Sequence, residues 1–348
     1  MNKAMMRVTA VLISLFVATQ AFADDKLVFA IDIIRHGDRT PIVELPNASY
    51  TWQQGLGRLT EEGMQQEYNL GVKMRAKYVD LYHLLPARYA DEAMYVRSTN
   101  VDRTLMSAQS LLYGLYPLGV GAATLPSAFQ PIPIHTIKKE EEILLIPDQD
   151  EKKFDALLHR YVYSQPEWKK KTSELHDKFR YWTELTGLKI GSLRDLVLLG
   201  DNLFVREHYQ VALPAGITEE DAQDIISTSK WAFSQLFYPR EVGEATAGAL
   251  LTEIKQHLKE ATDAKNKLKY VLYSAHDSTI MMVMSALAVP VAEWPHYASD
   301  LNFELFETPT NQYYVKISLN DEPVVVPACH ADTCSLAQFM QLVKSIRS

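Results

Sequence analysis

A short cluster of cationic side chains ends the first apolar run of the folded chain. The stretch "IIRHGDRTP", residues 33–41, places Arg35 and Arg39 on either side of His36. Like charges packed this closely are costly unless an anion lies among them. Guanidinium groups bind an oxyanion through paired N–H donors, and phosphate has enough oxygens to engage several of them. The cluster therefore predicts a phosphate-binding site with an imidazole beside it.

Two further charged motifs follow strand-like segments. "RSTNVDR", residues 97–103, follows "AMYV", and "SAHDS", residues 274–278, follows "KYVLY". If the three segments are parallel neighbours, the motifs converge at the carboxyl ends of the strands, where open α/β sheets bind ligands. Singly, each residue is readily explained as a surface charge or a structural group, and Arg97 could pair with Asp102. The charge density at residues 35–39 favours a functional site, whose members are Arg35, His36, Arg39, Arg103, His276 and Asp277.

The segments that would position these motifs alternate between strands and helices. Strand-like runs cover residues 26–34, 93–99 and 268–275, and helical patterns cover 59–78, 102–116, 243–267 and 278–289. The unbroken apolar run at 26–34 fits a strand buried on both faces, and Thr60 is a candidate N-cap followed by acidic residues. The alternation predicts an α/β fold with a mostly parallel central sheet and helices on both faces.

The tail and the middle of the chain depart from this pattern. Short runs at 302–308, 313–319 and 323–327, joined by turn signals, predict antiparallel edge strands near the C-terminus. Between 129 and 231 strand patterns fade and helical periodicity dominates. We therefore expect an α/β catalytic domain formed by residues 24–128 and 232–348, with a smaller α-helical cap inserted at 129–231. Its aromatic residues either line a hydrophobic entrance or, as is commoner, pack in the core: Tyr161, Tyr163, Trp168, Tyr181 and Trp182.

Composition and the N-terminus limit the partners and the compartment. The chain has 348 residues, 47% of them hydrophobic and 22% charged, and a formal net charge of −8. This is a globular composition, and the acidic balance argues against nucleic acid as a partner. A basic start, a short apolar stretch and small residues up to Ala23 predict a signal peptide at 1–23 rather than a membrane anchor. We expect a periplasmic or secreted protein with no stable membrane anchor.

The two cysteines, Cys329 and Cys334, lie close together near the C-terminus. Export brings a chain into an oxidising compartment, so a disulfide is expected. The bridge would close the loop "CHADTC" and contribute only about 2 kcal/mol. A zinc site that includes His330 is the alternative, but no second pair of ligands lies nearby in the sequence. We therefore expect a disulfide and no bound metal.

The charged motifs together resemble those of the histidine acid phosphatases, branch 2 of the histidine phosphatases in the phosphoglycerate-mutase-like superfamily. "RHGDRTP" looks like the family signature RHGxRxP, and "SAHDST" resembles its second motif, a His-Asp pair after a strand. "RSTNVDRTLMSAQSLLYGLYP" is similar to the segment that supplies a third arginine, and is closest to prostatic-type members; bacterial acid phosphatases share the form. "LTEEGMQQEYNLG" resembles a family helix. The resemblance covers most of the α/β region and is weakest in the helical insert.

This resemblance implies a covalent mechanism without a cofactor. His36 would be the nucleophile and form a phosphohistidine, and Asp277 would protonate the leaving alcohol. The phosphoryl oxygens would be held by Arg35, Arg39, Arg103 and His276. Three nearby guanidiniums should lower the pKa of His36 and keep it nucleophilic at acid pH, and they balance the charge that a metal often balances. The implied fold, a large α/β domain with a small helical cap, agrees with the pattern above.

We therefore expect an exported acid phosphatase that acts on small-molecule phosphomonoesters. A phytase-like member of the family and a mutase-like phosphotransferase are alternatives. A non-catalytic phosphate-binding protein is a third, although it gives His36 and Asp277 no purpose. The sequence decides neither the physiological substrate nor whether the chain forms a homodimer.

Overall fold

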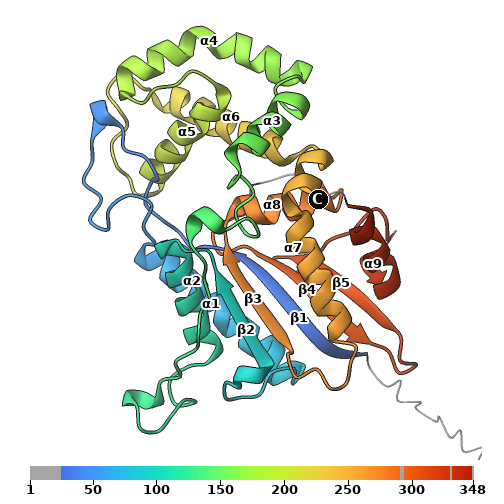
Figure 1. Ribbon diagram of the computed structural model, residues 1–348. Coiled ribbons are helices and arrows are strands. Elements are labelled where there is room, and N and C mark those ends of the chain that lie inside the picture. The colour runs from blue at the N-terminus through green and yellow to red at the C-terminus, as the bar shows by residue number, and fades with distance from the viewer. Residues whose placement is uncertain (1–24, 291–293, 330, 347–348) are drawn as a thin grey trace, which may run out of the picture.

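A twisted sheet with helices on both faces lies below a separate layer of helices in the computed structural model (Figure 1). The structure describes residues 25–290, 294–329 and 331–346. The predicted signal peptide at 1–23 lies outside the described residues. Within them, no helix combines the length and the apolar character needed to cross a membrane.

The sheet has the predicted mixture of parallel centre and antiparallel edge. Its order is β2-β3-β1-β4-β5-β6, with β7 also paired to β5. β1 and β2 both pair with β3 in parallel, whereas β4 and β5 continue the sheet antiparallel. The strands are β1 Lys26–Arg35, β2 Met94–Ser98, β3 Tyr270–Ala275, β4 Asp300–Glu307, β5 Tyr313–Leu319, β6 Glu322–Pro323 and β7 Thr333–Ser335.

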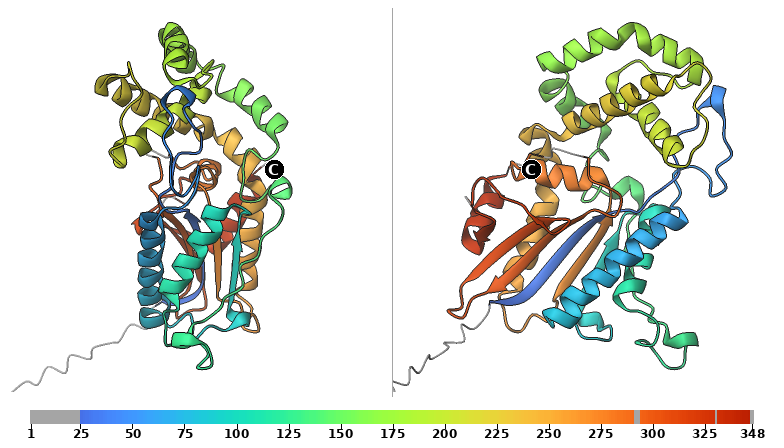
Figure 2. Two further views of the ribbon diagram at one scale, coloured as in Figure 1. Left: turned by 90° about the vertical axis from the view of Figure 1, so that its left-hand side faces the viewer. Right: turned by 180° about the vertical axis from the view of Figure 1, so that it is seen from behind.

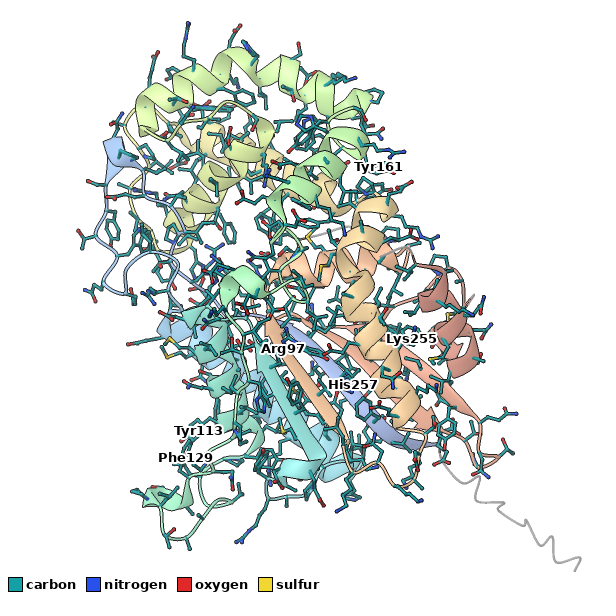
Figure 3. The ribbon with its side chains drawn as sticks, in the orientation of Figure 1. Arg97, Tyr113, Phe129, Tyr161, Lys255 and His257 are labelled. Carbon is teal, nitrogen blue, oxygen red and sulfur yellow. A yellow bond between two sulfur atoms is a disulfide. The ribbon has the colours of Figure 1, made fainter. Side chains whose placement is uncertain are left out.

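The two faces of the sheet bury two hydrophobic clusters, which explains the unbroken apolar run of β1. Phe29, Ile31 and Ile33 point into one cluster and Ala30 and Ile34 into the other. Helices α1 (Glu61–Met74) and α2 (Asp102–Leu115) cover the second cluster, and α7 (Arg240–Glu260), α8 (Asp277–Ala286) and α9 (Leu336–Ser345) lie on the opposite face (Figure 2). The ring of His257 on α7 stacks on that of Phe29, with 6.1 Å between centroids (His257 is labelled in Figure 3).

The upper layer consists of four of the helices that the chain forms between strands β2 and β3. They are α3 (Glu151–Tyr161), α4 (Pro166–Thr186), α5 (Leu193–His208) and α6 (Glu219–Phe237). The connection between β1 and α1 also reaches this layer, because Asn202 donates to the carbonyl of Val43 and Asn47 to that of Glu184, both at 2.8 Å. Trp168 and Trp182 are buried within the layer. Packing, not an entrance, accounts for these two aromatic residues.

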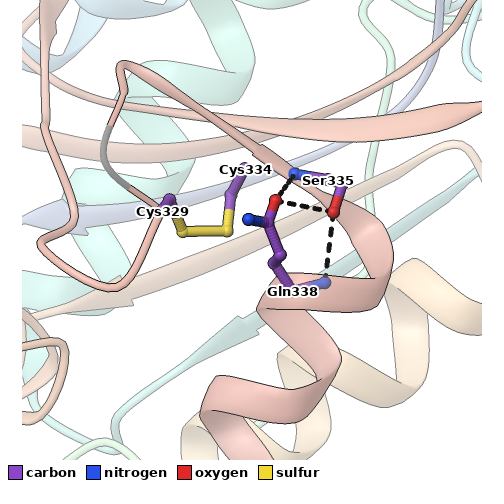
Figure 4. The surroundings of a disulfide bond; sticks show 4 residues. All are labelled: Cys329, Cys334, Ser335 and Gln338. Carbon is purple, nitrogen blue, oxygen red and sulfur yellow. Dashed lines mark hydrogen bonds between the residues drawn. A yellow bond between two sulfur atoms is a disulfide. The ribbon is translucent and has the colours of Figure 1, made fainter.

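The C-terminal segment is held by the predicted disulfide between Cys329 and Cys334 (Figure 4). Ser335 and Gln338 then form a capping box that starts α9, a helix that the sequence reading did not anticipate. The strand expected at 323–327 is reduced to β6, which ends at Pro323. Proline lacks the N–H that a ladder needs, so Pro323 and Pro327 limit strand pairing here.

Candidate active site

The three charged motifs meet at one edge of the sheet. Arg35 at the end of β1 pairs with Ala275 at the end of β3, and Ser98 at the end of β2 pairs with Ser274. All six predicted site residues therefore lie together at the carboxyl ends of three adjacent parallel strands. The alternative pairing of Arg97 with Asp102 is wrong, because Arg97 pairs with Glu142 at 2.9 Å and Asp102 pairs with Arg58.

The loop that carries His36 is fixed by close packing against α1 and α2. A Cβ on Gly37 would lie 2.3 Å from the carbonyl oxygen of Gly63, and a Cβ on Gly63 would lie 2.3 Å from that of Asp38. The Gly37 N–H donates to the Ser107 hydroxyl at 3.1 Å. Only glycine at both positions permits this approach, which holds the loop in place.

The imidazole of His36 is buried and held in one orientation. Its Nδ1 lies 2.8 Å from the carbonyl oxygen of Gly37. A carbonyl can only accept, so Nδ1 carries the hydrogen and Nε2 presents a lone pair. Burial, followed by the charges of Arg103, Arg35 and Arg39, holds the pKa of His36 well below its usual value. The sequence predicts the effect of the arginines; burial is the larger cause.

Three guanidiniums surround this ring, and each keeps an unused donor. Arg39 makes a two-fold hydrogen bond with Asp201, at 2.8 and 2.9 Å, and Arg35 pairs with Asp277 at 2.9 Å. Arg103 approaches Nδ1 of His276 at 3.5 Å, and burial together with Arg39 lowers its pKa to about 10. The Nε atoms of all three arginines are buried without a hydrogen-bond partner among the described residues. Such donors fit an oxyanion with several oxygens.

His276 and Asp277 stand at the N-terminus of α8, where helix N–H groups favour an anion. Nε2 of His276 lies 3.1 Å from the Thr99 hydroxyl, and burial and Arg103 lower its pKa to about 3. The Asp277 carboxylate accepts from Arg35, from Trp294 at 2.8 Å and from the N–H of Ser278 at 2.8 Å. Burial alone would raise the pKa of Asp277, but Arg35 and Trp294 outweigh it and lower this pKa.

Asp201 and Trp294 are site residues that the motifs did not reveal. Asp201 is a buried acid within the apolar stretch "LLGDNLF" of α5, and this placement is the sequence signal that could have found it. Trp294 stacks on Phe233 of α6 with 4.4 Å between centroids. Through them the helical layer contacts both Arg39 and Asp277.

One group of described residues has the spacing of metal ligands, namely Asp38, Glu62 and His208. Its atoms already have partners: His208 pairs with Glu62 at 2.8 Å, and Asp38 accepts hydroxyl hydrogens from Thr60 at 2.6 Å and from Tyr209. These hydrogen bonds connect the end of α5 to α1 and to the loop after His36.

A cavity of about 800 Å³ opens between the sheet edge and the helical layer. It exposes the reactive groups of the site: His36, Arg39, Arg103, His276 and Asp277. Arg35 lines an adjoining cavity of about 700 Å³, and Asp201 and Trp294 line both. The geometry thus provides a nucleophile, oxyanion donors and a carboxylate beside space for an organic group.

A family model, the histidine phosphatase superfamily (branch 2), matches residues 26–320. This chain belongs to that family. Prostatic acid phosphatase of Bos taurus is 33% identical over 93% of this chain and 86% of its own length. Lysosomal acid phosphatase of Xenopus laevis is 32% identical over 97% of this chain and 81% of its own length.

Solved phytases share the fold at lower identity. The phytase from Citrobacter braakii matches with a TM-score of 0.70 and 20% identity over 93% of this chain and 98% of its own. Hafnia alvei phytase in complex with tartrate matches with a TM-score of 0.70 and 16% identity over 94% and 98%. These neighbours confirm the predicted fold class.

Proposed function

We propose that this protein is an exported acid phosphatase that hydrolyses phosphate monoesters through a phosphohistidine on His36. The observation that carries the proposal is the grouping of three arginines, each with a buried Nε that has no hydrogen-bond partner among the described residues, around an imidazole that its lowered pKa keeps neutral and whose Nε2 is free. A phosphate-binding protein needs the arginines but not this nucleophile. The acid phosphatases at 32–33% identity support hydrolysis.

In the first step, Nε2 of His36 attacks phosphorus and the bond to the ester oxygen breaks. Arg35, Arg39, Arg103 and His276 hold the other phosphoryl oxygens and balance their charge. Phosphoryl transfer asks mainly for such positioning and charge stabilisation. Because the burial and the arginines keep His36 unprotonated, attack is available at acid pH.

The proton for the leaving alcohol passes through Asp277. With its pKa lowered by Arg35 and Trp294, Asp277 is a carboxylate before substrate binds. A phosphate ester has a second pKa near 6, so at acid pH it arrives with one proton. Asp277 accepts that proton and delivers it to the departing oxygen, and in the second step it takes a proton from the water that cleaves the phosphohistidine.

The α-helical cap, residues 129–231, would then enclose the substrate over an α/β catalytic domain of residues 24–128 and 232–348. The ion pair between Asp201 of α5 and Arg39 supports a cap that reaches the site, whereas α6 (Glu219–Phe237) runs across the boundary at residue 231. Export is inferred from the signal peptide that the sequence predicts at 1–23, and sequencing the N-terminus of the mature protein tests it. We expect the mature chain to begin at Asp24.

A labelling experiment tests the mechanism. Wild-type protein mixed with a ³²P-labelled phosphomonoester and quenched should carry acid-labile, base-stable label, and His36→Ala should carry none while retaining the wild-type circular dichroism spectrum. Added alcohols that divert most of the phosphate to new esters would indicate a phosphotransferase. Tight phosphate binding without any label or turnover would favour the alternative of a non-catalytic phosphate-binding protein.

A further inference from the structure

The charges of the catalytic cavity differ between its inner and outer parts. We call the inner part the phosphate seat: it is formed by Arg39, Arg103 and His276, together with Arg35, which reaches it from the adjoining cavity and pairs with Asp277. Arg35 and Arg39 are each paired with a carboxylate, whereas none of the ion pairs between described residues includes Arg103. The seat therefore has about one uncompensated positive charge, which matches the monoanion of one phosphate ester.

The outer part is acidic. Glu140, Asp148 and Glu151 line the cavity and are exposed, and within the part of the chain that the structure describes they take part in no ion pair. Lys139 and Arg194 are the cations on the same wall, and Arg194 already pairs with Asp155. A second phosphate outside the seat would meet three unpaired carboxylates and one unpaired ammonium group, and like charges repel it.

The same cavity also has apolar and partly aromatic walls. The stacked rings of Phe233 and Trp294 line the cavity, and the indole N–H of Trp294 donates to Asp277. The same surface continues with Ile146, Phe154, Val197, Leu198, Leu236 and Phe237. A flat apolar group attached to the phosphate can bury its surface here, and hydroxylated rings cannot replace their lost water contacts.

We propose that this cleft selects esters with a single phosphate on an apolar aromatic alcohol and discriminates against polyols that carry several phosphates. The proposal rests on the phosphatase function above and names its substrate class. It attributes the selection to two features of this cavity, the exposed carboxylates that have no ion-pair partner among the described residues, which we call the rim, and the apolar walls.

Three substrates test the selection near pH 6 in low salt, where exposed carboxylates are ionised. They are 1-naphthyl phosphate, phenyl phosphate and inositol hexakisphosphate. We expect kcat/KM to be about tenfold higher for the naphthyl than for the phenyl ester, because their leaving groups are similar in acidity and differ in apolar size. Inositol hexakisphosphate should be the poorest substrate. Leu198→Asn should remove most of the preference for naphthyl over phenyl.

Charge reversal tests the rim. Glu140→Lys combined with Asp148→Lys should raise kcat/KM for inositol hexakisphosphate by about fivefold per reversal and leave phenyl phosphate within about twofold. The control is Asp177→Lys on α4, whose fully exposed side chain does not line the cavity. It changes the net charge equally per substitution and should not change the ratio of the two substrates.

The outcomes separate this selection from the function beneath it. If wild-type protein hydrolyses inositol hexakisphosphate as efficiently as 1-naphthyl phosphate, or if the rim reversals act no differently from the control, the selection is wrong and the phosphatase stands. If wild-type protein hydrolyses none of the three esters, both proposals are wrong.

Discussion

Among the arginines of the phosphate seat, Arg103 is the one without a carboxylate partner among the described residues. Arg35 and Arg39 pair with Asp277 and Asp201, whereas the hydrogen-bonding neighbour of Arg103 among the described residues is the imidazole of His276, which its lowered pKa keeps neutral. Burial lowers its pKa to about 10, which still leaves the guanidinium charged at acid pH. Its full charge is therefore available to the transferring phosphoryl group.

Arg103→Ala should lower kcat/KM about 100-fold, since one preorganised oxyanion donor is worth roughly 3 kcal/mol. The change also removes a charge that lowers the pKa of His36. That pKa then rises, more of His36 is protonated at acid pH, and the acid limb of the kcat/KM profile moves to higher pH. Arg103→Lys retains the charge. It should restore the acid limb to its wild-type pH but recover little of the lost kcat/KM. An unchanged kcat/KM in Arg103→Ala would place this residue outside the seat.

Asp277→Asn should harm alkyl phosphates far more than nitrophenyl phosphate. An alkoxide is strongly basic and needs a proton as the P–O bond breaks, whereas nitrophenolate leaves without one. Asparagine retains the shape and part of the hydrogen bonding. Rapid-quench measurement of phosphoenzyme formation isolates this step from dephosphorylation. Equal losses for both substrates would assign Asp277 a positioning role for His276 or the phosphate.

Activity should not require a divalent cation, because the arginines supply the charge that a metal would otherwise supply. The check is turnover after dialysis against a chelator. If turnover is lost and a particular divalent cation restores it, the metal-free mechanism is refuted, and Asp38, Glu62 and His208 become the first ligands to examine.

At the scale of elements, helix α1 positions the catalytic loop by touching it at a glycine. Gly63 lies in the first turn of α1, capped by Thr60 as the sequence predicts. The backbone of Asp38 occupies the space that a side chain at Gly63 would need. Alanine favours a helix over glycine by about 1 kcal/mol, but forcing apart packed backbone usually costs about 1–3 kcal/mol. The packing cost should exceed the propensity gain.

Gly63→Ala should therefore destabilise the protein and lower kcat, although position 63 touches no substrate. Urea unfolding and kcat for 1-naphthyl phosphate measure the two effects. If Gly63→Ala instead raises the free energy of unfolding by about 1 kcal/mol and leaves kcat unchanged, close packing of the catalytic loop against α1 is needed neither for stability nor for activity.

Local patterns predicted the elements that have strong periodicity, and the motifs predicted which strand ends carry charge. The bidentate pair between Arg39 and Asp201 could not be predicted in this way, because 162 residues separate the partners and no motif marks the acid. The contact of Trp294, before β4, with Asp277 at the start of α8 could not be predicted either, because no motif marks Trp294. Helix α9 was missed for another reason: its capping box is local, but it follows a disulfide loop that obscures where the helix begins.

At the scale of the whole molecule, the core contains acids that are favoured in their protonated form. Burial raises the pKa of Asp32 on β1 and of Asp300 and Glu304 on β4, although Lys77 partly opposes it. Such groups stabilise the fold at acid pH. The buried histidines of the active site act in the opposite sense, since their lowered pKa values favour the unfolded chain as it takes up protons. The pH dependence of the free energy of unfolding is the sum of both contributions. A variant that changes one buried acid isolates its contribution more clearly than the wild-type curve does.

Glu67 offers that probe because it is buried on α1 and its carboxyl oxygens have no hydrogen-bond partner among the described residues. Burial raises its pKa well above the usual 4.5, and Ser107 opposes the shift only in part. At pH values between 4.5 and this raised pKa, Glu67 keeps its proton in the folded chain and loses it in the unfolded chain. The stability from Glu67 is therefore complete below the unfolded pKa and is lost as pH rises through the folded one.

Glu67→Gln is neutral at every pH and should remove this loss. The free energy of unfolding of this variant, minus that of wild type, should rise from pH 5 to pH 7. The rise is up to about 1.4 kcal/mol for each pH unit of this interval that lies below the pKa of Glu67 in the folded protein. The histidine contribution is common to both proteins and cancels in the difference. Urea titrations at the two pH values measure this difference in the free energy of unfolding. The control is Glu61→Gln on the same helix, which removes a carboxylate that is exposed rather than buried. A Glu67→Gln difference that is equal at pH 5 and pH 7 would contradict a protonated Glu67 in the folded protein.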